Sequence, residues 1–249
     1  MSDPIAVQAI DVTIGWGDTI LQEHATFDVP RGSIFAILGG SGCGKSTLLR
    51  HLIGLEEPIA GTINVDGCTP VQGPSQPPRF GVMFQSGALL GSLSVAENVA
   101  LPLQQWTRLP PDAVGGLVAA KLRLVGLSGA AEQMPAELSG GMRKRVAIAR
   151  AMALEPELIF LDEPSAGLDP VSSAGLDELI LDLNLQLGLT FVIVTHELES
   201  IFKVAQSCIM LDRATRSIIA RGDPRVLRDT SKDPRVLGFF NRIPGVATA

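Results

Sequence analysis

Tyrosine is absent from this chain of 249 residues, and the other aromatic residues are few, with nine Phe and two Trp. Charged residues make up only 18%, and 26 acidic residues outnumber 20 basic ones, giving a formal net charge of −6. Proteins that bind the phosphate backbone of nucleic acids are normally strongly basic, so this class is disfavoured. No uninterrupted apolar run approaches the roughly 18 residues that a membrane-spanning helix needs.

Cysteine is also scarce, and the three residues Cys43, Cys68 and Cys208 form no CxxC pair. An odd number at these spacings argues against a disulfide framework and is typical of a reducing compartment. The first ten residues, MSDPIAVQAI, lack a basic segment followed by an apolar core. We therefore expect no secretory signal there and a cytosolic location.

The apolar content is nevertheless high, with 46% hydrophobic residues and a mean hydropathy of +0.30. This composition excludes intrinsic disorder, which requires low hydrophobicity. The length corresponds to roughly 1.7 average domains, and hence to one large or one two-lobed domain. We expect part of the apolar surface to form an interface with a partner protein.

Strand patterns are clearest in the first third of the chain. Residues 5–14 and 20–29 alternate loosely around Gly15-Trp16-Gly17-Asp18, which predicts a β-hairpin. The continuous apolar run over 34–38 predicts a strand that is buried on both faces. We further expect a helix from Thr47 to about Gly54, a short strand over 62–67 and a Pro-rich loop over 70–78.

Helical spacing dominates from about 86 to 154, which predicts a helical insert with helices at Val114–Leu127 and Met142–Leu154. Buried-strand patterns return at Leu158–Leu161 and Phe191–Val194, with a helix-like stretch near 172–187 between them. Strand, helix and strand in this order predict a parallel sheet. Residues 208–211 and 217–220 flank a polar turn and suggest a closing hairpin.

The tail contains the pentapeptide DPRVL twice, at 223–227 and 233–237. One interpretation is two helix starts, each with Pro at its first position. The alternative is a docking tail for a partner, because Phe239 and Phe240 would otherwise be exposed.

The strongest chemical motif is Gly39-Gly40-Ser41-Gly42-Cys43-Gly44-Lys45-Ser46, which lies between a predicted strand and a predicted helix. Glycines allow successive backbone N–H groups to curl around phosphates, and the helix N-terminus adds the positive end of its dipole. Lys45 would reach the β- and γ-phosphates, and the Ser46 hydroxyl would hold Mg²⁺. The alternative, a Gly-rich turn without a ligand, does not explain this context.

Two further segments carry residues that could act together with this loop on a bound nucleotide. The apolar strand 158–161 ends in Asp162, which suits the Mg²⁺ shell, and Glu163, which can polarise a water for attack on the γ-phosphate. Leu138-Ser139-Gly140-Gly141-Met142 precedes a helix that Ser139 can cap, and its glycines leave N–H groups for an anion. Standing alone, the second segment would be interpreted as an ordinary N-cap.

The order of phosphate loop, Gln85, LSGGM, LIFLDE, Ser165-Ala166-Gly167-Leu168-Asp169 and His196 resembles that of the ATP-binding cassette (ABC) ATPases over residues 5–225. The resemblance implies ATP hydrolysis by a head-to-tail homodimer with two ATP molecules between its subunits. It implies that Ser139, Gly140 and Gly141 of one subunit face the γ-phosphate held by the other. Gln85 would contact Mg²⁺ or the water, His196 would grip the γ-phosphate, and Asp169 would touch the opposite subunit.

The resemblance assigns the catalytic roles to Lys45, Gln85, Glu163 and His196, and the Mg²⁺ contacts to Ser46, Gln85 and Asp162. The residues expected to bind ATP are Trp16, Gly39, Gly40, Ser41, Gly42, Cys43, Gly44, Lys45, Ser46, Thr47, Ser139, Gly140, Gly141 and Asp169.

Some positions depart from the commonest family pattern. Trp16 stands where a Tyr usually stacks on adenine, which an indole can also do, although it could instead be a packing residue of the hairpin. Gly40 replaces a frequent Pro, and Met142 replaces the usual Gln, which puts a ribose contact in doubt. Cys43 lies inside the loop, which suggests an ATPase sensitive to thiol reagents. His24 and His51 carry no motif and are interpreted as ordinary residues.

The fold implied is an α/β P-loop NTPase of RecA-like type, with a parallel sheet core, an N-terminal antiparallel β subdomain and a helical insert. We expect a nucleotide-binding core over 1–85 and 155–225, a helical lobe over 86–154 and a tail over 226–249. Leu89, Leu90 and Leu93 follow Gln85 and suit a groove for a helix of a membrane permease, unless they pack inside the lobe.

The segments FQSGALL (84–90), LSGGMRKRVAIARAMALEPELIFLDEP and the tail DPRVLGFF are similar to ATPases of MCE-type lipid transporters, above all the maintenance-of-lipid-asymmetry (Mla) system. This similarity implies an ATPase that powers phospholipid transport from the cytoplasmic face of the inner membrane. The implied partners are a permease, an MCE-domain protein and a small STAS-domain subunit. Two alternatives are the ATPase of an ordinary solute importer and a soluble regulatory or DNA-associated ABC protein.

Overall fold

A computed structural model describes residues 4–17, 19–70 and 76–243. The chain forms two compact units by its internal contacts. The first unit contains the described residues up to 70 and those from 190 onward, and the second contains residues 76–189. The expected helical lobe, residues 86–154, lies within the second unit, and its boundaries remain a prediction.

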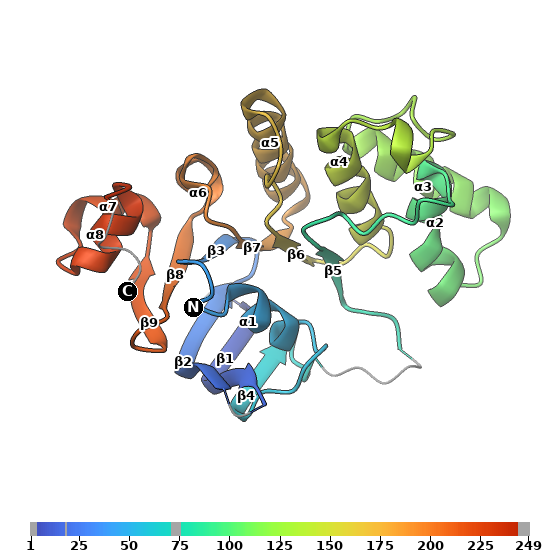
Figure 1. The fold of residues 1–249 in the computed structure, drawn as a ribbon. Coiled ribbons are helices and arrows are strands. Elements are labelled where there is room, and N and C mark those ends of the chain that lie inside the picture. Colours follow the sequence, from blue (N-terminus) through green and yellow to red (C-terminus); the bar gives the residue numbers. More distant parts are fainter. Residues whose placement is uncertain (1–3, 18, 71–75, 244–249) are drawn as a thin grey trace. The chain divides into compact units, whose positions relative to one another are not determined.

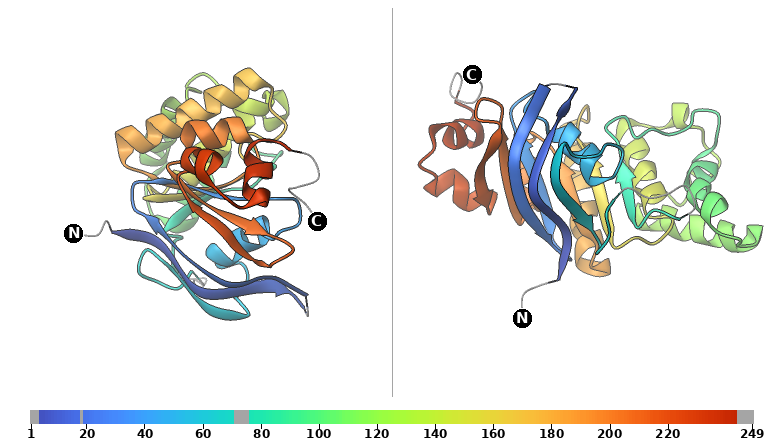
Figure 2. Two further views of the ribbon diagram at one scale, coloured as in Figure 1. Left: turned by 90° about the vertical axis from the view of Figure 1, so that its left-hand side faces the viewer. Right: turned by 90° about the horizontal axis from the view of Figure 1, so that it is seen from below.

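The first unit contains an antiparallel sheet in the order β2-β1-β4, drawn in blue and cyan in Figure 1. Its strands are β1 (Ile5–Trp16), β2 (Thr19–Pro30) and β4 (Ala60–Val65). The predicted hairpin is confirmed, with Trp16 opposite Thr19 beside the turn. Figure 2 shows β1 and β2 as a long curved pair, as expected from the right-handed twist of a two-stranded ribbon.

A second group of strands in the same unit surrounds β3 (Ile34–Gly39), every residue of which is buried. Strands β7 (Thr190–Val194) and β8 (Ser207–Asp212) pair with β3 on its two sides, both in parallel. Strand β9 (Ser217–Gly222) then pairs antiparallel with β8, which confirms the closing hairpin. The continuous apolar run of β3 is therefore that of a strand covered on both faces.

Three helices of this unit were predicted at least in part. Helix α1 (Lys45–Leu52) begins two residues before the predicted start. Helices α7 (Pro224–Thr230) and α8 (Pro234–Phe240) begin at the two DPRVL segments, where Asp223 and Asp233 each accept a hydrogen bond from a backbone N–H of the first turn. The short helix α6 (Leu198–Val204) was not predicted.

The tail packs on the first unit, and the prediction of a docking tail built on exposed Phe239 and Phe240 is wrong. Phe240 is 3% exposed and lies in a core cluster with Ala36, Leu38 and Met210. Phe239 is partly buried, and the two rings meet edge to face with 5.4 Å between centroids. Figures 1 and 2 show α7 and α8, in red, beside β9. Burial of the aromatic ring stabilises the tail, which explains why it is folded.

The second unit contains a pair of parallel strands, β5 (Phe80–Met83) and β6 (Leu158–Asp162), whose Phe80 and Phe160 rings stack edge to face. Four helices and a 3₁₀ turn complete it. They are α2 (Val95–Trp106), α3 (Pro111–Leu124), η1 (Pro135–Glu137), α4 (Gly140–Ala151) and α5 (Pro170–Leu187). Helix α4 contacts α2, α3, α5 and β5, and its residues 146–149 are buried. The predicted helical insert is therefore present, built around α4.

The boundaries within this unit differ from the prediction for identifiable reasons. Helix α3 starts at Pro111, which presets the helical φ, and ends before Gly126, whose φ of +73° an L-residue rarely adopts. Helix α2 was missed because Pro102 lies in its interior. A capping box between Ser94 and Glu97 marks its start and could have revealed it.

We expect Phe240→Ala to lower the free energy of unfolding by about 3–5 kcal/mol, because the truncation leaves a cavity in a buried cluster. Val226→Ala in α7 is the matched control, since Val226 is 55% exposed. Urea unfolding followed by circular dichroism measures both. Equal losses for the two variants would contradict the packing of the tail.

Candidate functional site

The phosphate loop joins β3 to α1 and closes around Lys45. Its ammonium Nζ donates to the carbonyl oxygens of Gly39 and Gly40, at 2.9 Å each. Gly42 and Gly44 have φ values of +73° and +98°, which glycine adopts without strain. A Cβ on Gly39 would lie 2.5 Å from the carbonyl oxygen of Leu211, so the close passage of β8 requires a glycine here. The loop thus has the backbone conformation that a phosphate cradle needs.

A side chain that the sequence did not single out supports this loop. The amide Nε2 of Gln22, on β2, donates to the carbonyl oxygens of Cys43 at 2.8 Å and Asp212 at 3.0 Å. Gln22 is fully buried. It connects the loop to β2 and to the end of β8, and a lone Gln in a strand gives no signal of such a contact.

Trp16 lies beside α1 with its ring accessible. Its indole Nε1 donates to the hydroxyl oxygen of Thr47 at 3.1 Å, and the Arg50 guanidinium lies 5.3 Å from the ring centroid. Trp16 is 52% exposed, so it is not the buried packing residue that the alternative interpretation of the hairpin requires. An exposed indole held at the edge of the phosphate loop can stack on a base.

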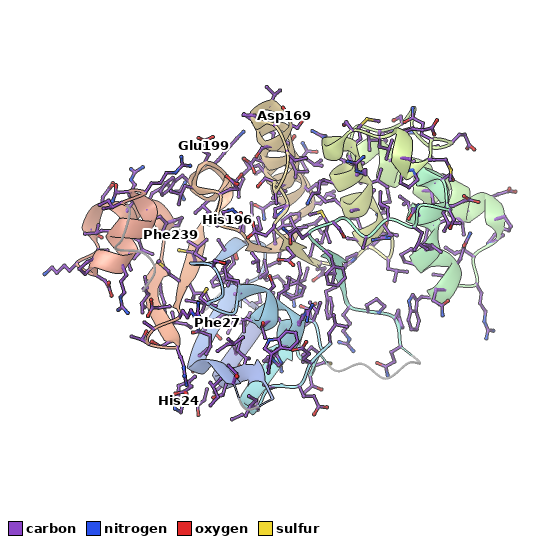
Figure 3. The ribbon with its side chains drawn as sticks, viewed as in Figure 1. His24, Phe27, Asp169, His196, Glu199 and Phe239 are labelled. Atoms are coloured by element: carbon purple, nitrogen blue, oxygen red, sulfur yellow. The ribbon has the colours of Figure 1, made fainter. Side chains whose placement is uncertain are left out.

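The three histidines have different surroundings. His196 follows β7 and is labelled in Figure 3. It is exposed and lies 3.8 Å from the carboxylate of Glu197. His24 contacts Asp11 at 2.7 Å, and this hydrogen bond raises the pKa of the exposed imidazole. His51 is buried in α1, where Nδ1 lies 3.0 Å from the carbonyl oxygen of Glu56. His24 and His51 thus each have a structural partner within the first unit.

In the second unit, Asp162 ends β6 and Glu163 follows it. Glu163 is 8% exposed and has a φ of +46°, which is unusual for a residue with a side chain. Strained backbone of this kind persists only where the surroundings hold it, and such residues often lie at functional sites. The local turn is closed by a hydrogen bond from Ala166 N–H to the carbonyl oxygen of Glu163, at 3.2 Å.

The LSGGM segment and Asp169 are brought together at the starts of two helices. The Ser139 hydroxyl caps α4 by accepting from the N–H of Met142 at 3.2 Å, as predicted. A Cβ on Gly140 would lie 3.1 Å from Leu168, and one on Gly141 would lie 3.3 Å from Ser172. Asp169, labelled in Figure 3, caps α5. Hydrogen bonding to Ser172 lowers the pKa of the Asp169 carboxyl.

Comparison with known proteins identifies this combination of loops. Residues 22–166 match the family described as ABC transporter. The phospholipid transport ATP-binding protein MlaF of Escherichia coli K12 is 42% identical over 238 residues, which cover 94% of this chain and 87% of MlaF. The chain belongs to the ABC transporter family. It is an ATP-binding subunit that hydrolyses ATP.

Other similar proteins and solved structures support this family assignment. "Probable ribonucleotide transport ATP-binding protein mkl" of Mycobacterium leprae is 40% identical over 95% of this chain and 69% of that protein. The structure of cbiO1 from Clostridium perfringens superposes with a TM-score of 0.81 at 27% identity, over 98% of this chain and 97% of cbiO1. The dimeric cassette MJ0796 bound to ADP and Pi gives a TM-score of 0.77 at 29% identity, over 87% of this chain and 98% of MJ0796. The α/β P-loop NTPase fold predicted from the sequence is thereby confirmed.

The second unit of this ABC subunit also offers apolar surface outside the nucleotide motifs. Leu90 is 48% exposed, while Leu89 and Leu93 are half-buried. The buried Asn98 holds this segment, because its amide bonds to the backbone of Leu90, Leu93 and Ser94 at 2.8–3.1 Å. The segment is therefore fixed with one leucine facing outward.

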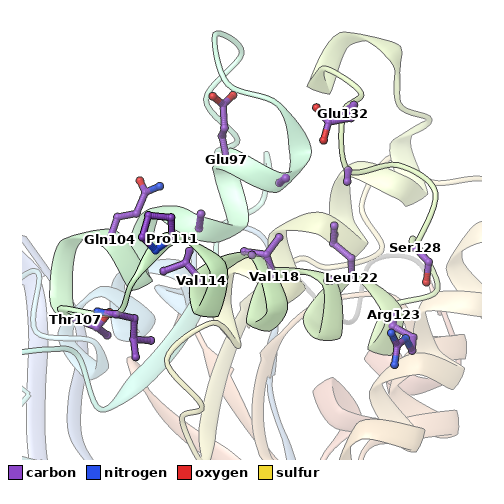
Figure 4. A pocket seen from close by; sticks show the side chains of 16 residues that line it. Glu97, Gln104, Thr107, Pro111, Val114, Val118, Leu122, Arg123, Ser128 and Glu132 are labelled. Carbon is purple, nitrogen blue, oxygen red and sulfur yellow. The ribbon is translucent and has the colours of Figure 1, made fainter.

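A groove of about 700 Å³ lies between α2 and α3 in the same unit (Figure 4). Val114, Val118 and Leu122 of α3 line it, and Glu97 and Glu132 stand at its edge. Within the part of the chain that the structure describes, no helix is both long and apolar enough to cross a membrane.

The expected sensitivity of Cys43 to thiol reagents is wrong for this structure. Cys43 is 1% exposed, and burial raises the pKa of its thiol, which disfavours the reactive thiolate. Burial also raises the pKa of Cys208 to about 12. Cys68 is half-exposed.

We therefore expect one thiol, that of Cys68, to react quickly with Ellman's reagent at pH 8, and all three to react after unfolding in urea. Cys68→Ser should abolish the fast phase, and Cys43→Ser should leave it unchanged. Loss of the fast phase in Cys43→Ser would contradict the burial of the loop thiol.

Proposed function

We propose that this ABC subunit powers phospholipid transport through a separate membrane permease. The observation that carries the proposal is the similarity to MlaF, which spans 94% of this chain and 87% of the Escherichia coli protein. MlaF of Haemophilus influenzae is similarly related, at 39% identity over 94% of this chain.

A second candidate is transport of a soluble solute, because the ATPase motifs do not depend on the substrate. The relative mkl, whose name refers to ribonucleotides, favours this alternative. The identity to MlaF, at 42%, is higher than the 40% identity to mkl, which favours the phospholipid system. A soluble regulatory or DNA-associated role is the least supported, because a net charge of −6 opposes binding to nucleic acid.

The family resemblance assigns the roles proposed for the phosphate loop, and the geometry of the loop supports them. Backbone N–H groups of residues 39–47 and the N-terminus of α1 would bind the phosphates of ATP. Lys45 would exchange the carbonyl oxygens of Gly39 and Gly40 for oxygens of the β- and γ-phosphates. The exposed ring of Trp16 would stack on adenine, and His196 would contact the γ-phosphate.

Glu163 is proposed as the base that polarises the attacking water. Within the second unit its carbonyl oxygen is fixed by two donors, the N–H of Ala166 and the ammonium of Lys144. A base held in one geometry can act on a bound water, and such a group typically contributes about 10²–10⁴-fold to the rate. Gln85 would contact the water or Mg²⁺.

Mg²⁺ fits the donors proposed for it, which are the Ser46 hydroxyl, the Gln85 amide oxygen and the Asp162 carboxylate. Among residues 4–17, 19–70 and 76–243, no cluster of three or more His, Cys, Asp or Glu residues could hold a metal ion on its own. Mg²⁺ in nucleotide sites is typically held by one or two carboxylates, here that of Asp162, together with phosphate oxygens and water. When bound, it would neutralise charge on the phosphates.

A second copy of the chain would complete each site. The N-terminus of α4, with Ser139, Gly140 and Gly141, is proposed to face the γ-phosphate held by the other subunit, and Asp169 to contact that subunit. The related cassette MJ0796 is described as dimeric in two structures. Charge stabilisation supplied in trans can be worth on the order of 10³–10⁵ in rate.

The proposed permease contact is the segment that presents Leu90, held by Asn98. An exposed leucine next to half-buried ones suits the apolar face of a helix from a membrane protein. The complex would contain an MCE-domain protein and a small STAS-domain subunit. It would hold this chain peripherally at the cytoplasmic face of the inner membrane.

We expect Glu163→Gln to bind ATP with affinity within a few-fold of the original and to lose about 10²–10⁴-fold in kcat, because the base is removed and the fold is kept. Lys45→Ala should lose nucleotide affinity instead. Glu57→Gln, at an exposed position, is the matched control. Phosphate release and equilibrium binding of a fluorescent ATP analogue measure the two quantities. Normal hydrolysis by Glu163→Gln would show that Glu163 is not the base.

The transport proposal is tested by purifying the chain with the membrane proteins that accompany it and reconstituting them in vesicles. We expect a permease and an MCE-domain protein, and ATP-dependent transfer of a labelled phospholipid. Leu90→Asp should release the permease, whereas Leu185→Asp, at a residue 84% exposed on α5, should retain it. Co-purification with a solute-binding protein and no MCE-domain protein would favour the second candidate.

A further inference from the structure

The basic residues of α4 all donate to backbone carbonyl oxygens. Arg143 bonds to Leu138, Arg145 to Val125 and Gly175, and Arg150 to Gly87 and Ala88, at 2.6–3.0 Å. Lys144 bonds to Gln85 and to Glu163, the latter at 3.1 Å. The three consecutive cations of RKR therefore all have main-chain acceptors, although only Lys144 is buried, while Arg143 is exposed and Arg145 is half-buried.

Lys144 differs from the three arginines of α4 in the residues whose carbonyl oxygens it contacts. Its side chain is 6% exposed, and its two acceptors belong to the residue proposed to contact the water or Mg²⁺ and to the proposed base. Burial lowers the pKa of Lys144, while the carboxylates of Asp162 and Glu163 oppose this shift, which places the ammonium in the field of both acids.

We propose that Lys144 is a positioning residue for ATP hydrolysis, whose ammonium fixes the backbone of Gln85 and Glu163 relative to each other and to α4. This inference rests on the roles proposed above for Gln85 and Glu163. It assigns no contact between Lys144 and the nucleotide.

The backbone conformation of Glu163 is the first argument. A residue with a side chain rarely adopts a φ of +46° unless its surroundings hold it there. The Lys144 ammonium and the Ala166 N–H both bond to the Glu163 carbonyl oxygen and so hold that peptide. The direction of the Glu163 side chain follows from this conformation.

The connection to α4 is the second argument. Helix α4 begins at Gly140, directly after its cap Ser139, and Lys144 lies one turn further along. One buried ammonium thus links the start of this helix to Gln85 and Glu163. We infer that a displacement of the start of α4 is transmitted to both, because the bond to Glu163 is buried and a buried carbonyl oxygen that loses its donor is costly.

The test compares Lys144→Met with Arg145→Met in the full chain. Both residues lie in α4, and each substitution removes the donor from two backbone carbonyl oxygens. The acceptors of Arg145, Val125 and Gly175, have no proposed part in hydrolysis. We expect Lys144→Met to lose about 10- to 100-fold in kcat with the KM for ATP within about 3-fold, since a displacement of about 1 Å can cost 10²-fold. Arg145→Met should lower the Tm but keep kcat per folded molecule.

Lys144→Arg restores a charged donor and should recover part of the lost kcat. Equal kcat losses in Lys144→Met and Arg145→Met, once scaled by the folded fraction from nucleotide binding, would overturn the proposal, as would an unchanged kcat in Lys144→Met. If Lys144→Met does not fold, Lys144→Gln is judged by the same criteria.

The assay measures ATP hydrolysis alone, so failure of the phospholipid proposal leaves its outcome unaffected. Failure of the base assignment is recognised separately, because Glu163→Gln would then hydrolyse ATP at the normal rate.

Discussion

The placement of β3 between β7 and β8 is the constraint on which the nucleotide site depends. Both neighbours pair with β3 in parallel and leave none of its six residues exposed. Strand β8 runs so close to the end of β3 that Gly39 has no room for a Cβ. The chain turns there into the loop that surrounds Lys45, and Gln22 holds the far side of that loop. The phosphate cradle is thus a consequence of how one buried strand ends.

Main-chain carbonyl oxygens recur as the partners of charged side chains in this protein. Lys45 holds the loop in the first unit, and Lys144 and Arg150 hold residues 85–88 in the second. A buried ammonium or guanidinium is costly without such acceptors, and the carbonyls in turn gain donors. A chain with a net charge of −6 can therefore hold individual cations at defined positions inside its fold. The overall charge says little about a site built in this way.

The sequence predicted most of the regular structure because local periodicity was strong. The β1–β2 hairpin, the buried β3 and both DPRVL helices were expected from alternation, apolar runs and Pro at the first helical position. Strand β5 was missed because it has four residues and contains Gly81, which suggests a break in a pattern. In the fold, that glycine lets the strand pass the carbonyl oxygen of Ala151, to which a Cβ would lie only 2.2 Å away. A close approach between distant segments cannot be predicted from local periodicity.

The sequence alone determined the chemistry of the phosphate loop, because the residues that form it are contiguous and the spacing of Gly39, Gly44 and Lys45 is itself the motif. It also predicted the cap at Ser139, where donor and acceptor lie three residues apart. Only the tertiary structure decided the burial of Cys43 and Phe240 and the contacts of Gln22 and Lys144. This burial and these contacts arise between segments that are far apart in the chain. Local sequence patterns do not encode such long-range packing.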